Sequence, residues 1–419
     1  MVYQRHYLDA LSRVPGPSAR HIALRVTAAA ERALRQGHPW LFDRSVRQQS
    51  HSGRPGDLAV VFDRRRRFLA VGLYDPGSPI RVRVLQHREP APIDQDWFRA
   101  RLAAAAQRRA LLREGDTTGY RLIHGGNDGL PGLVVDRYGQ TLVLKLYTPA
   151  WVPHLRDVLP ALVDVAPAER LVLRLGRAAQ AQPERLHGLS DGVVLCGPDL
   201  DGPVVFRENG LRFEADPVRG QKTGFFLDQR ENRARVEALA DDKRVLDAFA
   251  YTCGFSVYAA RGGARAVVSL DVSRPALAAS ARNFALNRGH PAIAAAAHEL
   301  LAEDAFEALD RLGRSGRRFD LAIVDPPAFA KEGAQVQQAL SAYAQLTRLG
   351  LGVLRPGGTL VQASCSSRVD ADAFFAAVNR AAADVGRPLR EIERTGHPLD
   401  HPVGFPEGAY LKCLFATAP

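Results

Sequence analysis

The chain has 419 residues, more than one ordinary domain holds, so we expect two or three domains. Hydrophobic residues make up 46% of it and charged residues 24%, which is the balance of a folded protein and excludes a disordered one. Lysine and arginine outnumber aspartate and glutamate by 56 to 45, and the resulting formal charge of +11 indicates an acidic partner.

The basic excess is concentrated at the start of the chain. Residues 1–90 hold 16 arginines against 7 acidic residues, a net charge of +9, and the remaining 329 residues carry only +2. Codon bias in a GC-rich genome also produces many arginines, but it does not explain why the excess lies at one end. The expected partner is a polyanion, and nucleic acid is favoured over a membrane because no basic amphipathic helix accompanies the excess.

Nothing in the sequence predicts a membrane or secreted protein. No run approaches the roughly 20 apolar residues that a membrane helix needs, and the polar residues 1–20 lack the apolar core of a signal peptide. The four cysteines, Cys196, Cys253, Cys365 and Cys413, are widely spaced, with no histidines nearby at zinc-ligand spacing. We therefore expect a cytoplasmic protein with neither a disulfide framework nor a metal site.

The first unit of the chain reads as β-rich. Alternating apolar positions predict strands over residues 21–26, 57–62, 68–74 and 80–85. The second and third of these strands are joined by Asp63 and four consecutive arginines, which form the densest positive cluster in the chain: Arg64, Arg65, Arg66 and Arg67. A segment with Pro90 and Pro92, residues 86–95, predicts a linker after a domain that spans residues 21–86.

A small α/β unit is expected over residues 95–196. Strong helix formers predict a helix over residues 96–113. Strands over residues 132–136, 141–147 and 170–175 and a helix over residues 150–163 complete the unit. A passage rich in glycine, proline and aspartate, residues 197–203, marks the next boundary.

From residue 204 to the end, strands alternate with helices. Glu208-Asn209-Gly210 lies between strands over residues 204–207 and 211–215 and predicts a hairpin. Further strands are expected over residues 245–248, 266–271, 321–325, 358–364, 389–394 and 411–416, with helices over residues 274–287, 335–354 and 370–383. This alternation predicts a parallel, doubly wound sheet whose ligands bind at the carboxyl ends of the strands.

Acidic residues stand at those strand ends: Asp247, Asp271, Asp304 and Asp325. Asp247 opens a tight strand-to-helix turn that matches neither a P-loop nor a GxGxxG fingerprint, and Asp271 lies where a carboxylate can accept hydrogen bonds from ribose hydroxyls. Each acid alone could simply cap a helix. Asp325 is the most informative, because Pro326 and Pro327 give it a rigid turn.

Longer motifs carry a family resemblance. The spacing of the four acids resembles that of class I S-adenosylmethionine-dependent methyltransferases. More narrowly, three segments resemble the bacterial large-subunit ribosomal RNA methyltransferase I family, whose members make 5-methylcytosine: residues 121–139 (RLIHGGNDGLPGLVVDRYG), residues 220–230 (GQKTGFFLDQR) and Ser364-Cys365-Ser366. Residues 38–42 (HPWLF) resemble the PUA RNA-binding domain that opens those proteins. The resemblance covers nearly the whole chain, about residues 21–416.

The resemblance implies three parts: a PUA domain over residues 21–86, a central α/β domain over residues 95–196, and a Rossmann-like, doubly wound methyltransferase domain over residues 204–419. It implies S-adenosyl-L-methionine as cofactor and allows a homodimer. The residues expected to bind the cofactor are Asp247, Phe249, Tyr251, Thr252, Gly254, Asp271, Ser273, Asp304, Asp325 and Pro326, with Gln229 and Arg230 from a lid-like segment at residues 222–230. For Gln229 and Arg230, an exposed helix start is the alternative.

Methylation of cytosine at carbon 5 needs a thiol, because that carbon is a poor nucleophile. A thiolate that adds to carbon 6 makes carbon 5 an enamine carbon. Cys365 follows the strand after Asp325 and is the expected nucleophile, although many free cysteines only pack. Asp325 is expected to hold the cytosine edge at N3 or N4. Ala328 stands where a second family of such enzymes has another cysteine, so the chain resembles the single-cysteine type.

One residue departs from the family pattern. Where the family commonly reads Tyr-Thr-Gly-Gly, this chain has Tyr251-Thr252-Cys253-Gly254. If the position needs a positive φ, a cysteine there is strained. We interpret Cys253 as a small buried residue beside the cofactor rather than a chemical group.

Two other functions remain open from the sequence. The first is methylation of guanine at N2 or N7. Enzymes that methylate exocyclic nitrogens often have an aromatic residue directly after Asp/Asn-Pro-Pro. Here Ala328 separates Asp325-Pro326-Pro327 from Phe329, which weakens this hypothesis. The second is a non-catalytic RNA-binding assembly factor. The expected substrate is ribosomal RNA, most simply 23S, with the arginines at residues 64–67 on its phosphates, although a solvated turn explains the same cluster.

Overall fold

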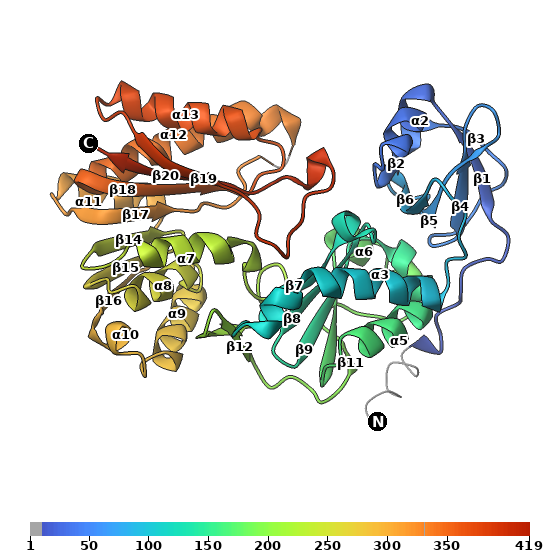
Figure 1. Cartoon of the computed structure of the whole chain (residues 1–419), viewed down its shortest axis with the longest axis horizontal. Coiled ribbons are helices and arrows are strands. Elements are labelled where there is room, and N and C mark those ends of the chain that lie inside the picture. The colour runs from blue at the N-terminus through green and yellow to red at the C-terminus, as the bar shows by residue number, and fades with distance from the viewer. Residues whose placement is uncertain (1–10, 331) are drawn as a thin grey trace. The chain divides into compact units, whose positions relative to one another are not determined.

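The structure, a computed structural model, describes residues 11–330 and 332–419 (Figure 1). The described chain forms two compact units. The first holds the residues up to Gly210 together with Ala215–Leu227 and Leu399–Gly408, and the second holds Leu211–Glu214, Asp228–Pro398 and Ala409–Pro419. Within the described residues, no helix is both long enough and apolar enough to cross a membrane.

The first sheet of the first unit has six strands in the order β2-β6-β5-β4-β1-β3. They are β1 (Ile22–Val26), β2 (Trp40–Phe42), β3 (Val46–Gln49), β4 (Leu58–Phe62), β5 (Phe68–Tyr74) and β6 (Ile80–His87). The sequence predicts four of them and misses the short strands β2 and β3. Helix α2 (Ala28–Arg35) begins after Thr27, whose hydroxyl accepts a hydrogen bond from the backbone N–H of Ala30 at 3.3 Å.

The second sheet of this unit has five strands in the order β11-β10-β9-β8-β7. They are β7 (Gly119–His124), β8 (Leu133–Tyr138), β9 (Thr141–Leu146), β10 (Arg170–Leu175) and β11 (Val194–Cys196), and the helices are α3 (Gln95–Arg108), α4 (Ala110–Glu114), α5 (Leu155–Val165) and α6 (Arg177–Gln180). The two sheets share a hydrophobic core, since Leu58 and Leu73 of the first pack in one cluster with Leu133 and Leu144 of the second.

Two helix predictions in this unit need correction. The helix predicted over residues 96–113 breaks at Arg109, which is 0% exposed and donates to both oxygens of Asp128 at 2.9 and 2.7 Å. Helix propensity does not record such a distant partner. The helix predicted over residues 150–163 starts as a 3-10 turn, η3 (Pro149–His154), which contains Pro149 and Pro153, and becomes α-helical only in α5.

The second unit is built on a seven-stranded sheet in the order β16-β15-β14-β17-β18-β20-β19. The strands are β14 (Arg244–Ala248), β15 (Ala266–Leu270), β16 (Ala297–Leu301), β17 (Phe319–Val324), β18 (Leu354–Ser364), β19 (Arg390–Thr395) and β20 (Lys412–Ala418). The helices are α7 (Arg230–Ala238), α8 (Gly254–Arg261), α9 (Arg274–Leu286), α10 (Pro291–Ala295), α11 (Ala305–Arg314), α12 (Val336–Val353) and α13 (Ala371–Asp384). This is the Rossmann-like, doubly wound architecture that the sequence predicts.

The expectation of a parallel sheet is wrong at one strand, β20, which lies next to the edge strand β19. Strand β20 is antiparallel to both of its neighbours, β18 and β19. The reason is its connection, because the segment between β19 and β20 contains only the 3-10 turn η7 (Pro406–Gly408) and no crossover α-helix. The edge strand β16 is also absent from the prediction, because its residues are mostly exposed and show no apolar run.

The hairpin predicted from Glu208-Asn209-Gly210 is confirmed, with β12 (Val204–Glu208) and β13 (Leu211–Ala215) paired in a two-stranded sheet. Asn209 and Gly210 have φ values of 48° and 81°, as a turn with both central residues left-handed requires.

The register of the large sheet brings four loops to one edge. Strand β14 pairs in parallel with β15 and β17, with Ala248 opposite Leu270 and Val324. Strand β17 pairs in parallel with β18, with Val324 opposite Gln362. The segments after these strands therefore meet at the carboxyl edge, where ligands bind in such sheets.

Candidate active site

Asp247, near the end of β14, is 1% exposed. Its Oδ2 accepts hydrogen bonds from the backbone N–H of Ser256 at 3.1 Å and from the Ser256 hydroxyl at 2.6 Å. Its Oδ1 is buried with no hydrogen-bond partner among the described residues. Burial first, and then the negative charges of Asp325 and Asp271, raise the pKa of Asp247 to about 7. A cationic ligand at this edge would relieve the mutual repulsion of the three carboxylates.

The turn after β14 holds several side chains in the left-handed backbone region. Phe249, Tyr251 and Cys253 have φ values of 63°, 50° and 64°. The condition under which the sequence predicts strain at Cys253 is therefore met, and such a conformation costs a non-glycine residue about 1–2 kcal/mol. Burial raises the pKa of the Cys253 thiol to about 12, so this thiol stays protonated and unreactive.

Asp271 directly follows β15 and faces the same turn. Its two oxygens accept hydrogen bonds from the backbone N–H groups of Tyr251 and Ser273, both at 2.8 Å. These bonds fix the orientation of the carboxylate. The residue is only partly buried, so acceptor capacity remains for the hydroxyls of a ligand.

Ser273 and Asp304 both serve as helix N-caps. The Ser273 hydroxyl accepts from the backbone N–H of Ala276 at 3.3 Å at the start of α9. Asp304 accepts from the backbone N–H groups of Phe306 and Glu307 at 2.9 and 3.2 Å at the start of α11. The simpler interpretation of a strand-end acid, a cap, therefore describes what Asp304 contacts within the chain.

Asp325 directly follows β17 and is oriented by Gln229. The Gln229 side-chain amide donates to Asp325 Oδ2 at 2.9 Å, while its own oxygen accepts from Asn232 at 2.6 Å. Because Asn232 occupies that oxygen, the NH₂ group of Gln229 is the one that faces Asp325. Gln229 and Arg230 are 3% and 1% exposed, so the alternative of an exposed helix start is wrong.

Cys365 directly follows β18 and is the least buried of the four cysteines, all of which lie within the described residues. Cys196, Cys253 and Cys413 are buried, and burial raises the pKa of each of these three thiols. A nucleophilic thiol must be both reachable and able to ionise. Cys365 is the cysteine with the exposure that this role requires.

A hydrogen bond joins the segments that carry Cys365 and Asp325. The Ser366 hydroxyl donates to the backbone oxygen of Ala330, five residues after Asp325, at 3.1 Å. Burial first, and then the charges of Cys365 and Asp325, raise the pKa of Tyr343 to about 12. The Tyr343 hydroxyl also accepts a hydrogen bond from Ser364, the residue before Cys365, at 2.9 Å.

Lys412 of β20 is a site residue that the sequence analysis misses. It is 5% exposed, and its ammonium donates to the backbone oxygens of Ser366, Val369 at 2.6 Å and Tyr410 at 3.2 Å. Burial lowers its pKa to about 8, partly offset by the charge of Cys365. The lysine clamps the segment that carries the thiol. Its signal in the sequence is weak: a lone lysine in an apolar strand.

A row of aromatic rings also lies at this edge. The ring centroids of Phe249 and Phe306 are 6.4 Å apart, and those of Phe306 and Phe329 are 6.3 Å apart. Phe306 follows Asp304 and Phe329 follows Asp325 by a few residues, and that proximity is the signal that could have marked them. Rings beside strand-end carboxylates suit a ligand with both an apolar face and polar hydroxyls.

These residues fit S-adenosylmethionine, the cofactor that the resemblance implies. The cofactor is a sulfonium cation, which matches the three mutually repelling carboxylates and the unpartnered oxygen of Asp247. Its ribose hydroxyls match the oriented, partly exposed carboxylate of Asp271. Its adenine matches the aromatic row.

The arginine cluster of the first unit divides into paired and unpaired members. Arg67 Nε lies 2.8 Å from Asp63, and Arg64 Nε lies 3.6 Å from Glu31. Arg65 and Arg66 form no ion pair with any residue in the described part of the chain. They lie in the β4–β5 turn, as predicted, and are exposed.

Sequence comparison finds matches along nearly the whole chain. Residues 121–416 match a family described as S-adenosylmethionine-dependent methyltransferase, and residues 24–87 match a PUA-like domain. A protein of Deinococcus radiodurans named ribosomal RNA large subunit methyltransferase is 51% identical over 406 residues, which covers 96% of this chain and 98% of that protein. A Pseudoalteromonas translucida protein named ribosomal RNA large subunit methyltransferase I is 35% identical over 395 residues, with 94% and 98% covered.

Two solved structures share the fold. One is described as a SAM-dependent methyltransferase from Streptococcus mutans, and the other as a methyltransferase complexed with SAH. Each has a TM-score of 0.80 and 22% sequence identity, and each alignment covers 94% of this chain and 99% of the solved chain.

Proposed function

Because this chain belongs to the ribosomal RNA large-subunit methyltransferase I family of S-adenosylmethionine-dependent enzymes, we propose that it methylates carbon 5 of a cytosine in 23S ribosomal RNA. The family supports the coarser activity, S-adenosylmethionine-dependent methylation of large-subunit ribosomal RNA. The carbon-5 assignment rests on one observation. Cys365, the least buried thiol in the chain, follows β18 at the sheet edge that also carries Asp325.

The proposed chemistry assigns one role to each of these two side chains. The Cys365 thiolate adds to carbon 6, and the electron pair of the C5–C6 double bond makes carbon 5 nucleophilic. S-adenosylmethionine, when bound, supplies the methyl group as an electrophile. Loss of the carbon-5 proton to a base, followed by cleavage of the S–C6 bond, restores the aromatic ring and the thiolate.

Asp325 is proposed to hold the cytosine edge at N3 or N4. The Gln229 amide, itself oriented by Asn232, supports this role by fixing the carboxylate. A carboxylate that a hydrogen bond already orients loses less freedom when the base binds.

For the cofactor we propose the residues named from the sequence, with unequal support. Asp247, Asp271 and the turn from Phe249 to Gly254 have a geometry that suits the ligand. Ser273 and Asp304 are occupied as helix caps and contribute chiefly by shaping the loops. Pro326 and Arg230, which are both buried, are proposed to shape the wall beside Asp325.

RNA affinity is proposed to come from the PUA domain, with Arg65 and Arg66 freer to reach phosphates than the ion-paired Arg64 and Arg67. A ribosomal substrate implies action in the cytoplasm. The homodimer that the resemblance allows stays a prediction, as do the domain boundaries at residues 21–86, 95–196 and 204–419.

The experiment is a map of 5-methylcytosine in ribosomal RNA from cells with and without the gene. We expect one cytosine of 23S RNA to lose its mark without the gene and to regain it when wild-type protein is supplied. A Cys365→Ala variant should not restore it. If the missing mark is instead on a guanine nitrogen, or if no mark changes, the carbon-5 assignment is wrong.

A further inference from the structure

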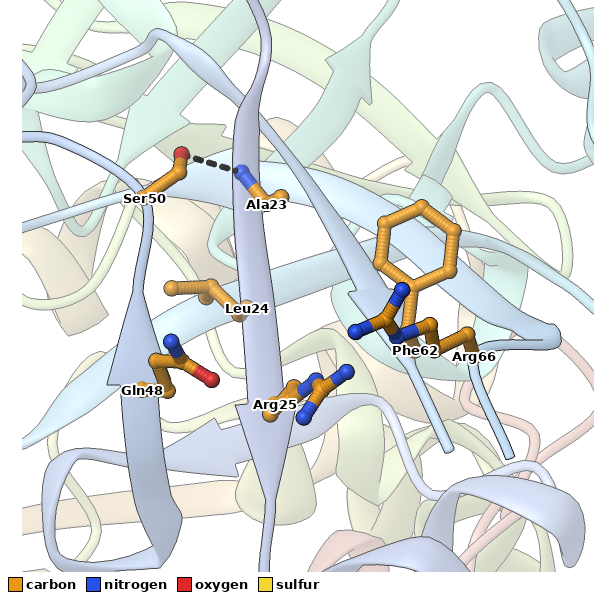
Figure 2. A pocket seen from close by; sticks show the side chains of 7 residues that line it. All are labelled: Ala23, Leu24, Arg25, Gln48, Ser50, Phe62 and Arg66. Atoms are coloured by element: carbon orange, nitrogen blue, oxygen red, sulfur yellow. Dashed lines mark hydrogen bonds between the residues drawn. The ribbon is translucent and has the colours of Figure 1, made fainter. Parts of the chain in front are cut away.

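The first sheet of the PUA domain carries a pocket of about 410 Å³ that the proposed chemistry does not use. Figure 2 shows its lining side chains, among them Arg25 from β1, Gln48 from β3, Phe62 from β4 and Arg66 from the β4–β5 turn. Its volume lies within the range of small-ligand sites, about 300–1,000 Å³.

The strand register places three of these side chains in one row. Arg25 lies opposite Gln48 in the antiparallel β1–β3 pair and opposite Phe62 in the parallel β1–β4 pair. Directly paired residues project from the same face of a sheet, so the guanidinium, the amide and the ring stand side by side. Arg66, from the β4–β5 turn, lines the same pocket (Figure 2).

The two arginines of the pocket form no ion pairs with acidic residues of the described chain. Neither Arg25 nor Arg66 forms a side-chain ion pair or hydrogen bond with any residue in 11–330 or 332–419. The neighbouring Arg35, Arg64 and Arg67 are paired with Glu31 or Asp63. Two arginines without an ion pair therefore line this pocket, within a segment whose net charge is +9.

We propose that this pocket binds one unpaired nucleotide of the RNA substrate, with its base on the Phe62 ring and its phosphate on Arg25 and Arg66. The inference rests on the proposed function in taking RNA as the partner. An aromatic ring flanked by guanidinium groups on a sheet is the chemistry that holds single-stranded nucleic acid. The Gln48 amide, a donor and an acceptor, suits a base edge. A base within a duplex cannot reach the ring, so the pocket selects unpaired RNA.

The test measures binding of a short single-stranded oligoribonucleotide to the full chain by fluorescence anisotropy at several salt concentrations. Phe62→Leu keeps an apolar side chain but removes the stacking face, and we expect affinity to fall about fivefold to 100-fold. Arg25→Ser should reduce the slope of log affinity against log salt by about 0.7. Arg66→Asn, chosen because asparagine tolerates the φ of 62° at this position, should do the same.

Arg47→Ser is the matched control. Arg47 precedes Gln48 on β3, does not line the pocket, and is exposed with no ion pair among the described residues. The control should keep the wild-type salt slope. The same oligoribonucleotide closed into a duplex should bind wild type and Phe62→Leu equally.

The proposal is overturned if Phe62→Leu binds the single strand as wild type does, or if Arg25→Ser and Arg47→Ser change the slope equally. If Phe62→Leu does not fold, the salt slopes of Arg66→Asn and Arg47→Ser decide, and equal slopes overturn the proposal. Methyl transfer by wild type to ribosomal RNA separates the two claims. Its absence overturns the proposed function, whereas unchanged variant affinities beside normal wild-type methyl transfer overturn only the pocket.

Discussion

Two loops at the same edge of the large sheet each carry a cysteine, and they differ in almost every other respect. After β14, Cys253 is fully buried in a left-handed turn, and burial raises the pKa of its thiol to about 12. After β18, Cys365 is partly exposed and lies in a segment clamped by the ammonium of Lys412. Exposure and local charge, rather than the presence of sulfur, therefore distinguish a structural thiol from a candidate nucleophile.

The largest expected effect comes from removing each thiol in turn. Cys365→Ala should lower methyl transfer by about a thousandfold or more, because a nucleophile has no substitute in covalent catalysis. Cys253→Ala should stay within a few-fold of wild type, because that thiol is protonated and buried. Single-turnover transfer of labelled methyl groups to ribosomal RNA measures both. Equal losses in the two variants would remove the distinction between the loops.

Variants of Asp271 and Asp304 test which of these carboxylates binds the cofactor. Asp271→Ala should weaken S-adenosylmethionine binding by about one to two orders of magnitude, because the ribose hydroxyls lose a charged acceptor. Asp304→Ser is the matched variant, since serine still caps α11 and only the carboxylate is lost. Calorimetry should show a smaller change for Asp304→Ser. Unchanged affinity in Asp271→Ala would move the ribose site elsewhere.

The charge of Lys412 is expected to increase the reactivity of Cys365 in the second loop. Lys412→Met should slow alkylation of Cys365 by about tenfold near neutral pH, because a positive charge that favours the thiolate is lost. The pKa of Lys412 is lowered to about 8, so the ammonium is charged below that pH and loses its proton above it. The advantage of wild type over the variant should therefore fade as pH rises through 8. Lys412→Arg, which keeps the charge, should react more like wild type.

The smallest effect concerns the left-handed turn. At a φ of 64°, glycine is unstrained and alanine is not, so Cys253→Gly should be more stable than Cys253→Ala by about 1 kcal/mol. Chemical denaturation of the two variants measures the difference. A more stable alanine variant would show that the turn relaxes and that the strain is not retained.

The sequence predicts most of this architecture because local patterns carry it. The hairpin at Asn209-Gly210 and the strand ahead of Asp325 follow from turn chemistry and apolar runs. What it misses has two kinds of cause. Arg109 ends helix α3 and pairs with Asp128, a partner that no local pattern records. The antiparallel direction of β20 follows from a connection without a helix, which the sequence does mark with Pro398, Pro402 and Pro406.

The candidate site divides in the same way. Asp271, Asp325 and Cys365 can be identified because they follow recognisable strands. The positions of Gln229 and Lys412 cannot be predicted in this way. Gln229 is placed by its hydrogen bond to Asp325, and Lys412 by its hydrogen bonds to the segment after Cys365. A lysine in an apolar strand is by itself indistinguishable from a surface residue.

The central claim is that Cys365 attacks cytosine, and RNA with 5-fluorocytosine at the target position tests it most directly. Fluorine cannot leave carbon 5 as a cation, so the methylated intermediate cannot complete elimination, and the S–C6 bond persists. We predict a covalent protein–RNA adduct with wild type and with Cys253→Ala, mapped by mass spectrometry to Cys365, and none with Cys365→Ala. A wild-type enzyme that methylates normal RNA yet forms no Cys365-dependent adduct would contradict the assignment.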